Sequence, residues 1–366
     1  MKSYNHLWEL FISEENITLA IEQASKGKYD RNEIIQAHQN LNATIKYIKE
    51  YAENFHNCEH TPVHIYDGIS RKKRKIIVPK YKEQIIHHMA VNVLQPIFMR
   101  GMYEHSYGSI PGRGLHKGMK RIKKWIKHKK KDVKYCLKMD IKKFFDSIPH
   151  DILINKLRSI IHDERFLSLV IELISVTDEG IPLGFYTSQW FANWYLQKLD
   201  HYIKEELHAK CYIRYMDDMV IFCSNKKELH EMKGAISSYL NNNLGLTLKK
   251  NWQVFRFDYI KNGEHHGRCL DFIGFKFYRD KIVLRKSIML KVSRKARKMS
   301  KKDRESLYDI RQLLSYLGWL SCTDTYNMYL KHIKPYINMG KYKKRISEYD
   351  KFLKKNERRY LYDYKL

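Results

Sequence analysis

The spacing of apolar residues divides the chain into a helical N-terminal part, a central part with strands, and a helical C-terminal part. Over residues 1–55, apolar side chains recur at the spacing of amphipathic helices. Residues 71–98 begin as a basic strand, break at Pro79 and continue as a helix. The Gly/Pro-rich stretch over residues 106–114 is a loop, and residues 115–126 carry their apolar side chains on one helical face.

The central part alternates between strand and helix patterns. Residues 135–145 predict a strand that turns into a helix, and residues 155–177 predict another amphipathic helix. A loop over residues 179–189 leads into a helix that begins at Trp190. The stretch CYIRYMDDMVIFC, residues 211–223, then predicts a β-hairpin with two aspartates at its turn.

Beyond this hairpin, the pattern predicts a helix over residues 227–243, a strand over residues 244–250 and a second hairpin over residues 269–284. The second hairpin turns at Arg279-Asp280, and from Ser287 onward the chain is helical and basic. These elements together predict an α+β fold with a central antiparallel sheet and helical ends.

The net charge of the chain indicates which class of partner it binds. Lysine and arginine outnumber aspartate and glutamate by 69 to 40, a formal net charge of +29. Such a charge repels itself unless a polyanion neutralises it. The sequence has no apparent transmembrane helix, amphipathic anchor or lipidation motif, so we expect nucleic acid rather than a membrane surface.

The cysteines indicate a reducing compartment. None of the six forms a C-x-x-C pair, and most lie among apolar residues, which favours buried free thiols. The N-terminus has acidic residues where a signal peptide needs an apolar core. We therefore expect a cytoplasmic protein.

Two local patterns leave alternatives open. His56, Cys58, His60 and His64 suggest a zinc site by composition, but their spacing fits no standard finger and favours a surface loop. The lysine run that contains Lys123, Lys124 and Lys127 is either a solvated face or a track for a phosphate backbone.

Three carboxylates carry the candidate chemistry. Asp140 ends an apolar strand, and Asp217 and Asp218 lie at the turn of the first hairpin. If neighbouring strands bring these side chains together, their pKa values rise unless divalent cations bind them. Oxygen ligands suit Mg²⁺, with Mn²⁺ as a substitute, and two such ions activate an attacking 3′-oxygen and stabilise leaving pyrophosphate.

The sequence around these carboxylates resembles the reverse transcriptases of the group II intron-like bacterial superfamily. YMDD after an apolar strand is the family's signature, and LKMDIKKFFDSIPHDIL resembles the first catalytic block. Other blocks follow in the family's order, over roughly residues 60–335. They are RKIIVPKYKEQIIHHMAVNVLQPIF, SYGSIPGRGLHKGM, GIPLGFYTSQWFANWYL, LGLTLKKNWQVF and FIGFKFY.

The resemblance implies a right-hand polymerase. An N-terminal helical extension would cover residues 1–60, fingers 61–134, palm 135–285 and a basic helical thumb 286–366. Part of the fingers would return at about 155–180 within the palm range.

The resemblance also implies roles for individual residues. Asp140, Asp217 and Asp218 would be the catalytic carboxylates, and the Ile141 carbonyl would add a metal ligand. Phe145 would exclude a ribose 2′-hydroxyl, which argues against synthesis of RNA. The residues implied in nucleotide binding are Arg74, Lys72, Arg113, Phe145, Leu183 and Gly184, with Lys82 a weaker candidate. Those implied in the primer grip are Phe272, Ile273 and Gly274, and those implied in nucleic-acid binding are Lys123, Lys124, Lys127, Arg294 and Arg297.

Two departures from the family pattern matter. Leu183 and Gln189 stand where most relatives carry Gln and Pro, as in the reverse transcriptases of diversity-generating retroelements, which copy RNA with frequent errors at adenines. The family lysine proposed as general acid for pyrophosphate falls near Trp252, so Lys249 or Lys250 would have to replace it.

Several functions fit these observations. The first is an RNA-directed DNA polymerase of a diversity-generating retroelement. The second is a defence-associated reverse transcriptase that copies a dedicated non-coding RNA, and the third is a non-catalytic maturase-like RNA-binding protein. The first two imply template RNA, RNA/DNA hybrid and dNTPs as partners, with an accessory RNA-binding protein or a homo-oligomer as further partners. The thumb-like region shows no Cys/His-rich nuclease pattern after it, so we expect a chain that does not cut its own target DNA, and the resemblance implies a bacterial or phage-encoded protein.

Leu183 allows a test of fidelity. The aliphatic side chain removes an amide expected near the incoming nucleotide, which should loosen geometric selection. We expect Leu183→Gln to lower misincorporation several-fold, measured by sequencing cDNA copied from a defined RNA. An unchanged error rate would contradict this account.

Overall fold

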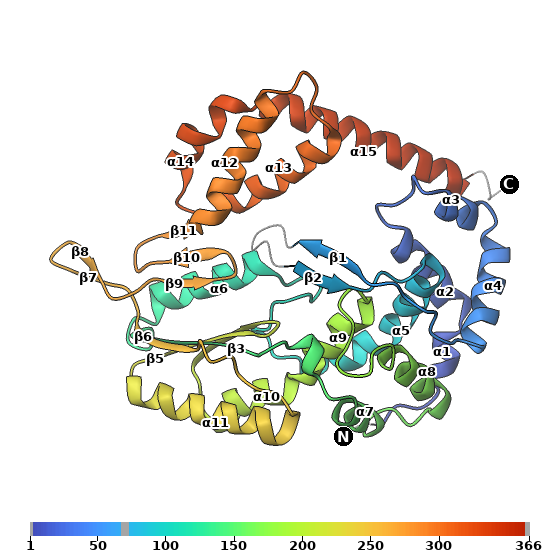
Figure 1. Cartoon of the computed structure of the whole chain (residues 1–366), viewed down its shortest axis with the longest axis horizontal. Coiled ribbons are helices and arrows are strands. Elements are labelled where there is room, and N and C mark those ends of the chain that lie inside the picture. Colours follow the sequence, from blue (N-terminus) through green and yellow to red (C-terminus); the bar gives the residue numbers. More distant parts are fainter. Residues whose placement is uncertain (1–2, 67–72, 363–366) are drawn as a thin grey trace.

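The structure is a computed structural model that describes residues 3–66 and 73–362, with side chains described up to residue 352. Its N-terminal part contains the helices α1 (Leu7–Phe11), α2 (Glu14–Ser25), α3 (Asn32–Gln39) and α4 (Leu41–Glu53). Helices α1, α2 and α4 pack against the long helix α5 (Tyr81–Met99) (Figure 1). A ribbon of β1 (Val63–Tyr66) and β2 (Lys73–Ile76) precedes α5.

A four-stranded antiparallel sheet forms the centre of the molecule. Its strand order is β4 (Cys211–Tyr215), β5 (Asp218–Cys223), β3 (Tyr135–Asp140) and β6 (Gln253–Arg256). Helix α11 (Lys226–Leu244) packs against three of these strands, and α6 (Leu115–His128) lies on the other side and contacts β4 (Figure 1). The sheet is therefore buried on both faces, and alternate residues of its strands belong to two separate apolar cores.

The C-terminal part is a second layer above this sheet. The three-stranded sheet of β9 (Leu270–Phe272), β10 (Phe275–Phe277) and β11 (Ile282–Leu284) leads into the helices. These are α12 (Lys286–Ser300), α13 (Leu307–Leu320), α14 (Tyr326–His332) and α15 (Met339–Tyr362). The long α15 runs back across the molecule and contacts α3 of the N-terminal part (Figure 1).

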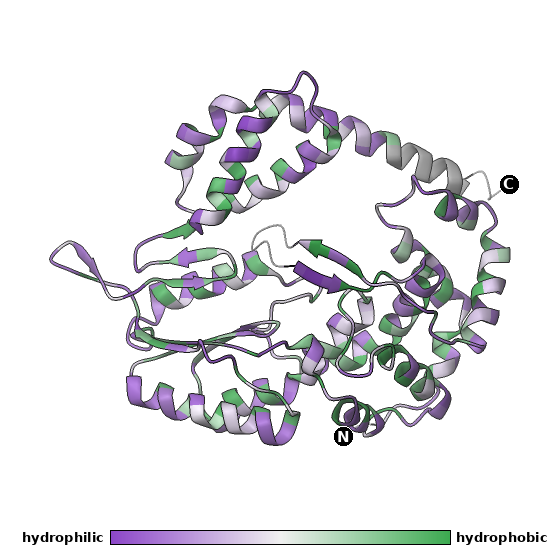
Figure 2. Cartoon of the chain, viewed as in Figure 1, coloured by the Kyte–Doolittle hydropathy of each residue, from purple (hydrophilic) through white to green (hydrophobic). Residues whose placement is uncertain are grey.

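Hydrophilic residues concentrate on the outer elements of the molecule (Figure 2). Hydrophilic residues line much of α11 and α12, and they line the ribbon of β7 (Tyr259–Lys261) and β8 (Glu264–His266) that projects from one side (Figure 2). Among the described helices, none combines the length and the apolar character that crossing a bilayer requires. All six cysteines are free thiols. Cys136, Cys211 and Cys223 are buried, and the other three are half-buried.

The predicted α+β class with a central antiparallel sheet is confirmed, but the predicted helix over residues 155–177 is wrong. Two helices occupy this region, α7 (His150–Arg158) and α8 (Glu164–Ile174). The break exists because Tyr4 pairs with it, through Tyr4 N to Ile160 O at 2.9 Å and His162 N to Tyr4 O at 3.0 Å. Asp163 then caps α8 by accepting a hydrogen bond from Phe166 N.

Three other boundaries differ from the prediction. Helix α9 (Tyr186–Tyr195) begins four residues before the predicted start, and α10 (Gln197–His201) follows it. The predicted strand over residues 244–250 forms only a single bridge, Leu248 to Ile141, because β3 has ended at Asp140. The predicted hairpin over residues 269–284 is three short strands, with an extra turn at Ile273-Gly274 where both residues have positive φ.

The cap of α8 gives a test of how the N-terminus is attached. Asp163 accepts from Phe166 N at 3.0 Å and from Trp8 N at 2.8 Å, so it caps one helix and holds another. We expect Asp163→Ala to lower the free energy of unfolding by about 2 kcal/mol, measured by urea denaturation. Ser13→Ala, which removes the local cap of α2, should cost about 1 kcal/mol. Equal losses would contradict the second role of Asp163.

Candidate active site

The register of the central sheet brings the three predicted carboxylates together. Asp140, the last residue of β3, lies directly opposite Asp218, the first residue of β5. Asp217 lies in the two-residue turn between β4 and β5, and its carboxyl group lies near that of Asp140. All three line one cavity of about 740 Å³.

The turn that carries Asp217 is strained. Met216 has φ of 55°, a left-handed conformation that costs on the order of 1–3 kcal/mol for a non-glycine residue. Tyr215 and Asp218 pair across the turn, so only Met216 and Asp217 connect the strands. This tight connection fixes the direction in which the two aspartates leave the sheet.

Burial and neighbouring charge raise the pKa values of two of the carboxyl groups. Burial, together with the proximity and charge of the Asp140 carboxyl group, raises the pKa of Asp217 to about 7. Burial raises the pKa of Asp218 to about 6, and the charge of Asp140 adds to this effect although Lys138 opposes it. The ionised forms of Asp217 and Asp218 are therefore disfavoured in the site without a bound cation.

Two lysines partly compensate for this charge. The Lys249 ammonium forms an ion pair with Asp140 Oδ2, and Lys249 N donates to Asp140 O at 2.8 Å. Lys138 Nζ lies 3.7 Å from Asp218 Oδ2. The other carboxylate oxygens, Asp140 Oδ1 and Asp218 Oδ1, are buried without a hydrogen-bond partner.

Unpartnered carboxylate oxygens fit a divalent cation, since oxygen is the ligand that Mg²⁺ prefers. The three aspartates do not each present an oxygen within 4.8 Å of the other two. Among the residues described, only Asp258, His265 and Asp280 meet that geometry. The latter group lies at the base of the β7–β8 ribbon, where Asp258 already accepts from His265 and from Arg279 N.

Three of the six residues predicted to bind the nucleotide line the same cavity. Arg74 reaches it from β2, Phe145 from the short helix after β3, and Leu183 from the loop before α9. Gln189, in α9 itself, also lines the cavity. Lys72 lies outside the described residues, but its neighbours Lys73 and Lys75 also line the cavity, as does Lys143. Cations from the first ribbon thus face the carboxylates across one cavity.

Leu183 and Gly184 connect this loop to β2. The Leu183 carbonyl accepts from Ile77 N at 2.8 Å. Gly184 has φ of 114°, and a Cβ there would lie 2.0 Å from Ile77 O, so only glycine fits. Gly184 therefore holds the loop against the Arg74 strand rather than lining the cavity itself.

The three predicted primer-grip residues lie where β9 meets β10: Phe272 ends β9, and Ile273 and Gly274 form the turn. Ile273 and Gly274 line the cavity, whereas Phe272 is fully buried beneath them. A Cβ on Gly274 would come within 2.5 Å of the Trp319 ring, so the turn packs tightly against α13. Ile141, the residue after Asp140, is also buried and is paired with Leu248.

Other predicted residues are not brought to the cavity. Arg113 points inward, where its Nη1 donates to Tyr103 O at 2.5 Å and Ser106 O at 3.1 Å, and Lys82 lies over the Tyr51 ring. Some exposed cations lie on helices away from the carboxylates. They are Lys123, Lys124 and Lys127 on α6 and Arg294 and Arg297 on α12.

His56, Cys58, His60 and His64 all lie among the described residues and do not form a metal-binding group. The His60 side chain is buried and lies 3.1 Å from the Glu83 carboxylate, which also accepts from Lys80 N and Cys58 N. Residues 54–62 form a loop, as predicted, and these contacts anchor the loop to α5. Sequence reasoning missed a second buried pair, Arg214 with Asp200, although a charged residue within an apolar strand was the available signal.

Comparisons with known proteins agree with this arrangement. The family described as reverse transcriptase (RNA-dependent DNA polymerase) matches residues 66–277, which is more than half of the chain. An α+β polymerase is the class that the fold and this match define. The chain belongs to the reverse transcriptase family.

Individual relatives share a smaller part. The retron Ec73 reverse transcriptase of Escherichia coli is 26% identical over 175 residues, covering 43% of this chain and 52% of that protein. The group II intron-encoded protein LtrA of Lactococcus lactis is 26% identical over 144 residues, covering 37% and 23%. An uncharacterized 91 kDa protein in the cob intron of Schizosaccharomyces pombe is 31% identical over 150 residues, covering 38% and 18%.

The chain therefore spans about half or less of the length of these relatives. Among solved structures, telomerase from Candida albicans in complex with a fragment of telomeric RNA has a TM-score of 0.49 at 11% identity. That similarity covers 80% of this chain and 61% of telomerase.

The raised pKa values give a pH dependence with a defined sign. A carboxyl group whose folded pKa lies above its unfolded value near 4 stabilises the fold when protonated, and this stabilisation is lost as pH rises towards 7. Without divalent cations, we expect wild type to lose on the order of 2 kcal/mol more than Asp217→Asn between pH 5 and 8. Urea denaturation in EDTA measures this difference.

Added Mg²⁺ should reduce this difference, because a bound cation stabilises the ionised carboxylates. Identical pH profiles for wild type and Asp217→Asn in EDTA would show that the three carboxyl groups do not interact as described.

Proposed function

We propose that this chain is an RNA-directed DNA polymerase that copies a structured or element-encoded RNA. The observation that carries the proposal is the pairing of Asp140 with Asp218, beside Asp217, in a cavity that also holds Arg74 and Phe145. Membership of the reverse transcriptase family supports RNA as template and dNTPs as substrates. The relatives are a retron reverse transcriptase and group II intron proteins, which fits a chain that works with a dedicated RNA.

Asp140, Asp217 and Asp218 would hold two Mg²⁺ ions, with the Ile141 carbonyl as a further ligand. Bound there, the ions would activate the 3′-oxygen of the primer and stabilise the pyrophosphate that leaves. The unpartnered oxygens of Asp140 and Asp218 support this set. In this assignment the buried sheet holds the carboxylates rigid, so their charge is in place before the substrate arrives.

The cations around the cavity would bind the triphosphate. Arg74 suits this role through its planar guanidinium, and Lys73, Lys75 and Lys143 line the same cavity. Phe145 would exclude a 2′-hydroxyl and so select dNTPs. Lys249, already at Asp140, is the nearest candidate to protonate the leaving pyrophosphate, which answers the absence of lysine at Trp252.

We assign domains on the same basis. Residues 61–134 would form fingers, 135–285 the palm with a returning fingers segment, and 286–366 the thumb, after an N-terminal extension. Ile273 and Gly274 would position the primer end from the palm–thumb boundary. The exposed cations on α6 and α12 would contact phosphates of the hybrid outside the cavity.

Within the family, we propose a low-fidelity enzyme of a diversity-generating retroelement. Leu183 and Gln189 both line the cavity, so the two departures from the usual Gln and Pro lie where they would touch the nucleotide or template. Sequencing the RNA that copurifies with the chain, and its cDNA, tests this proposal. A template/variable repeat pair would support it, and a dedicated non-coding RNA from a defence locus would replace it.

The polymerase activity itself is tested by incorporation of dNTPs on a primed RNA with Mg²⁺. We expect Asp217→Asn to reduce incorporation at least 1,000-fold, because one ligand of the proposed metal set is lost. RNA affinity should be unchanged. Asp151→Asn, which alters an exposed carboxylate on α7, is the matched control and should keep wild-type activity.

A wild-type chain that binds its copurifying RNA but incorporates no nucleotide would contradict the polymerase proposal and favour a maturase-like binding function. Equal activities of Asp217→Asn and Asp151→Asn would remove Asp217 from the catalytic set.

A further inference from the structure

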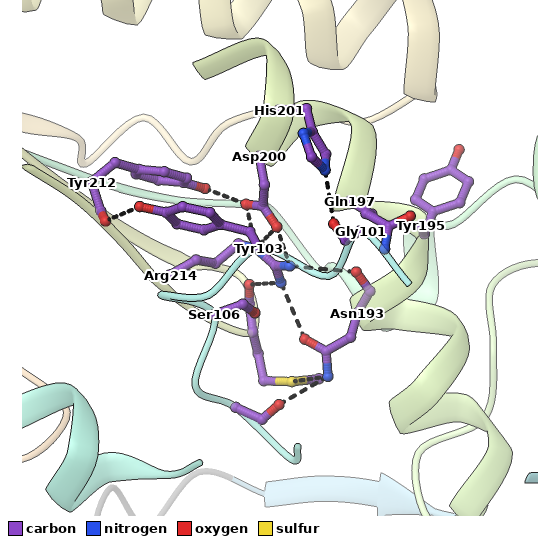
Figure 3. A network of polar contacts seen from close by, with 12 residues as sticks. Gly101, Tyr103, Ser106, Asn193, Tyr195, Gln197, Asp200, His201, Tyr212 and Arg214 are labelled. Carbon is purple, nitrogen blue, oxygen red and sulfur yellow. Dashed lines mark hydrogen bonds and ion pairs between the residues drawn. The ribbon is translucent and has the colours of Figure 1, made fainter. Parts of the chain in front are cut away.

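A buried ion pair lies directly beneath the turn that carries Asp217. Arg214, in β4, and Asp200, in α10, both have fully buried side chains. Arg214 Nε donates to Asp200 Oδ1 at 2.8 Å and Nη2 donates to Oδ2 at 2.6 Å, so the contact is bidentate (Figure 3). Tyr212 Oη also donates to Asp200 Oδ1 at 2.7 Å, which fixes the orientation of the carboxylate.

The other guanidinium contacts connect this pair to the turn. Arg214 Nη1 donates to Met216 O at 3.1 Å and to Asn193 Oδ1 at 3.2 Å, and Nη2 donates to Asn193 O at 3.4 Å. One side chain thus bonds to the residue immediately before Asp217. It also bonds to Asn193 of helix α9 (Figure 3). Such an arrangement uses the five donors of arginine, and a lysine ammonium does not reproduce it.

Asn193 holds the turn from a second direction. Its Nδ2 donates to Gly108 O at 2.9 Å and to Gln189 O at 3.1 Å, and lies 3.4 Å from Met216 Sδ. A Cβ on Gly108 would lie 2.8 Å from Met216 N, so the loop that contains Gly108 presses directly on the turn. Met216, whose φ is 55°, is therefore enclosed by contacts on both sides.

A buried ion pair adds little to stability compared with apolar packing, so stability alone gives weak reason for this one. Burial lowers the pKa of Arg214, but the charge and hydrogen bonds of Asp200, together with Tyr212, outweigh burial and leave that pKa above its ordinary value. The guanidinium thus keeps its charge and all its donors. A permanently charged, fully bonded group is suited to hold a strained backbone in one conformation.

We propose that Arg214, Asp200 and Asn193 form a positioning network that fixes the Met216-Asp217 turn, and through it the Asp217 carboxylate, for catalysis. None of the three lines the cavity, so they are positioning residues and not catalytic ones. The inference rests on the proposed polymerase function. The new element is that the position of Asp217 depends on helices α9 and α10 as well as on the β4–β5 hairpin.

Asn193→Ala is the central variant, because it leaves the Arg214–Asp200 pair intact. Its control is Tyr195→Phe, which removes another buried hydrogen bond of α9, from Tyr195 Oη to Leu244 O at 2.6 Å, away from the turn. The measured quantities are kcat and KM for a dNTP on primed RNA, and Mn²⁺ affinity of the nucleotide-free protein by calorimetry. Circular dichroism shows that each variant is folded.

We expect Asn193→Ala to lower kcat about 30-fold and Arg214→Lys about 100-fold, with KM within about threefold, because small displacements of a reacting group have large kinetic effects. Mn²⁺ affinity should fall about fivefold in both variants. Tyr195→Phe should stay within about twofold of wild type in every quantity except stability. Folded Asn193→Ala with the kcat and Mn²⁺ affinity of Tyr195→Phe would overturn the network.

Failure of the proposed function remains distinguishable from failure of the network. If wild type incorporates no nucleotide, the polymerase proposal fails. The Mn²⁺ affinities measured by calorimetry then still test whether the network positions Asp217. Equal Mn²⁺ affinities of wild type and Asn193→Ala would then overturn it, whereas a fivefold loss in Asn193→Ala alone would support it.

Discussion

The pairing of β3 with β5 is the constraint on which the site depends. Because side chains in a sheet alternate between its faces, one register places Asp140 opposite Asp218, and a shift by one residue would turn Asp140 to the other face. Apolar cores on both sides of the sheet fix that register. The carboxylates meet because the strands around them have no other way to bury their apolar residues.

The cluster of three carboxyl groups lowers the stability of the folded protein at this end of the sheet. Three carboxyl groups at one end of a buried sheet repel one another, and the pKa values of Asp217 and Asp218 show that the fold favours their protonated forms. Lys249 and Lys138 relieve part of the repulsion. The strained backbone of Met216 is a second unfavourable contribution to stability. Local strain held by surrounding structure is typical of functional sites, where a rigid geometry serves a ligand and not the empty protein.

Much of the fold and of the candidate site could be predicted, for physical reasons. The hairpin over residues 211–223 was predictable because two apolar strands flank one short polar turn, and the same pattern at Asp140 identified its partner strand. Arg74, Phe145 and Leu183 were found through family motifs and meet in one cavity.

What sequence reasoning missed depends on contacts between distant residues. The break between α7 and α8 is made by Tyr4, more than a hundred residues away, and no local pattern contains it. Arg113 carries the same charge as Arg74, yet it turns inward to two backbone carbonyls, which its sequence position does not reveal. Arg214 was overlooked because one charge in a strand usually faces solvent, and its partner Asp200 lies on a helix.

At position 183 the main chain and the side chain have different roles, which the sequence alone does not distinguish. The backbone carbonyl of Leu183 holds β2 through Ile77 N, and Gly184 lets the two segments approach. These contacts belong to the main chain and would be the same with any side chain at position 183. Leu183 also lines the cavity, so its side chain is not fixed by the contacts that join the loop to β2. In the proposed polymerase, the side chain at position 183 would therefore respond to what the cavity must accept, whereas the three aspartates would serve the chemistry common to any substrate.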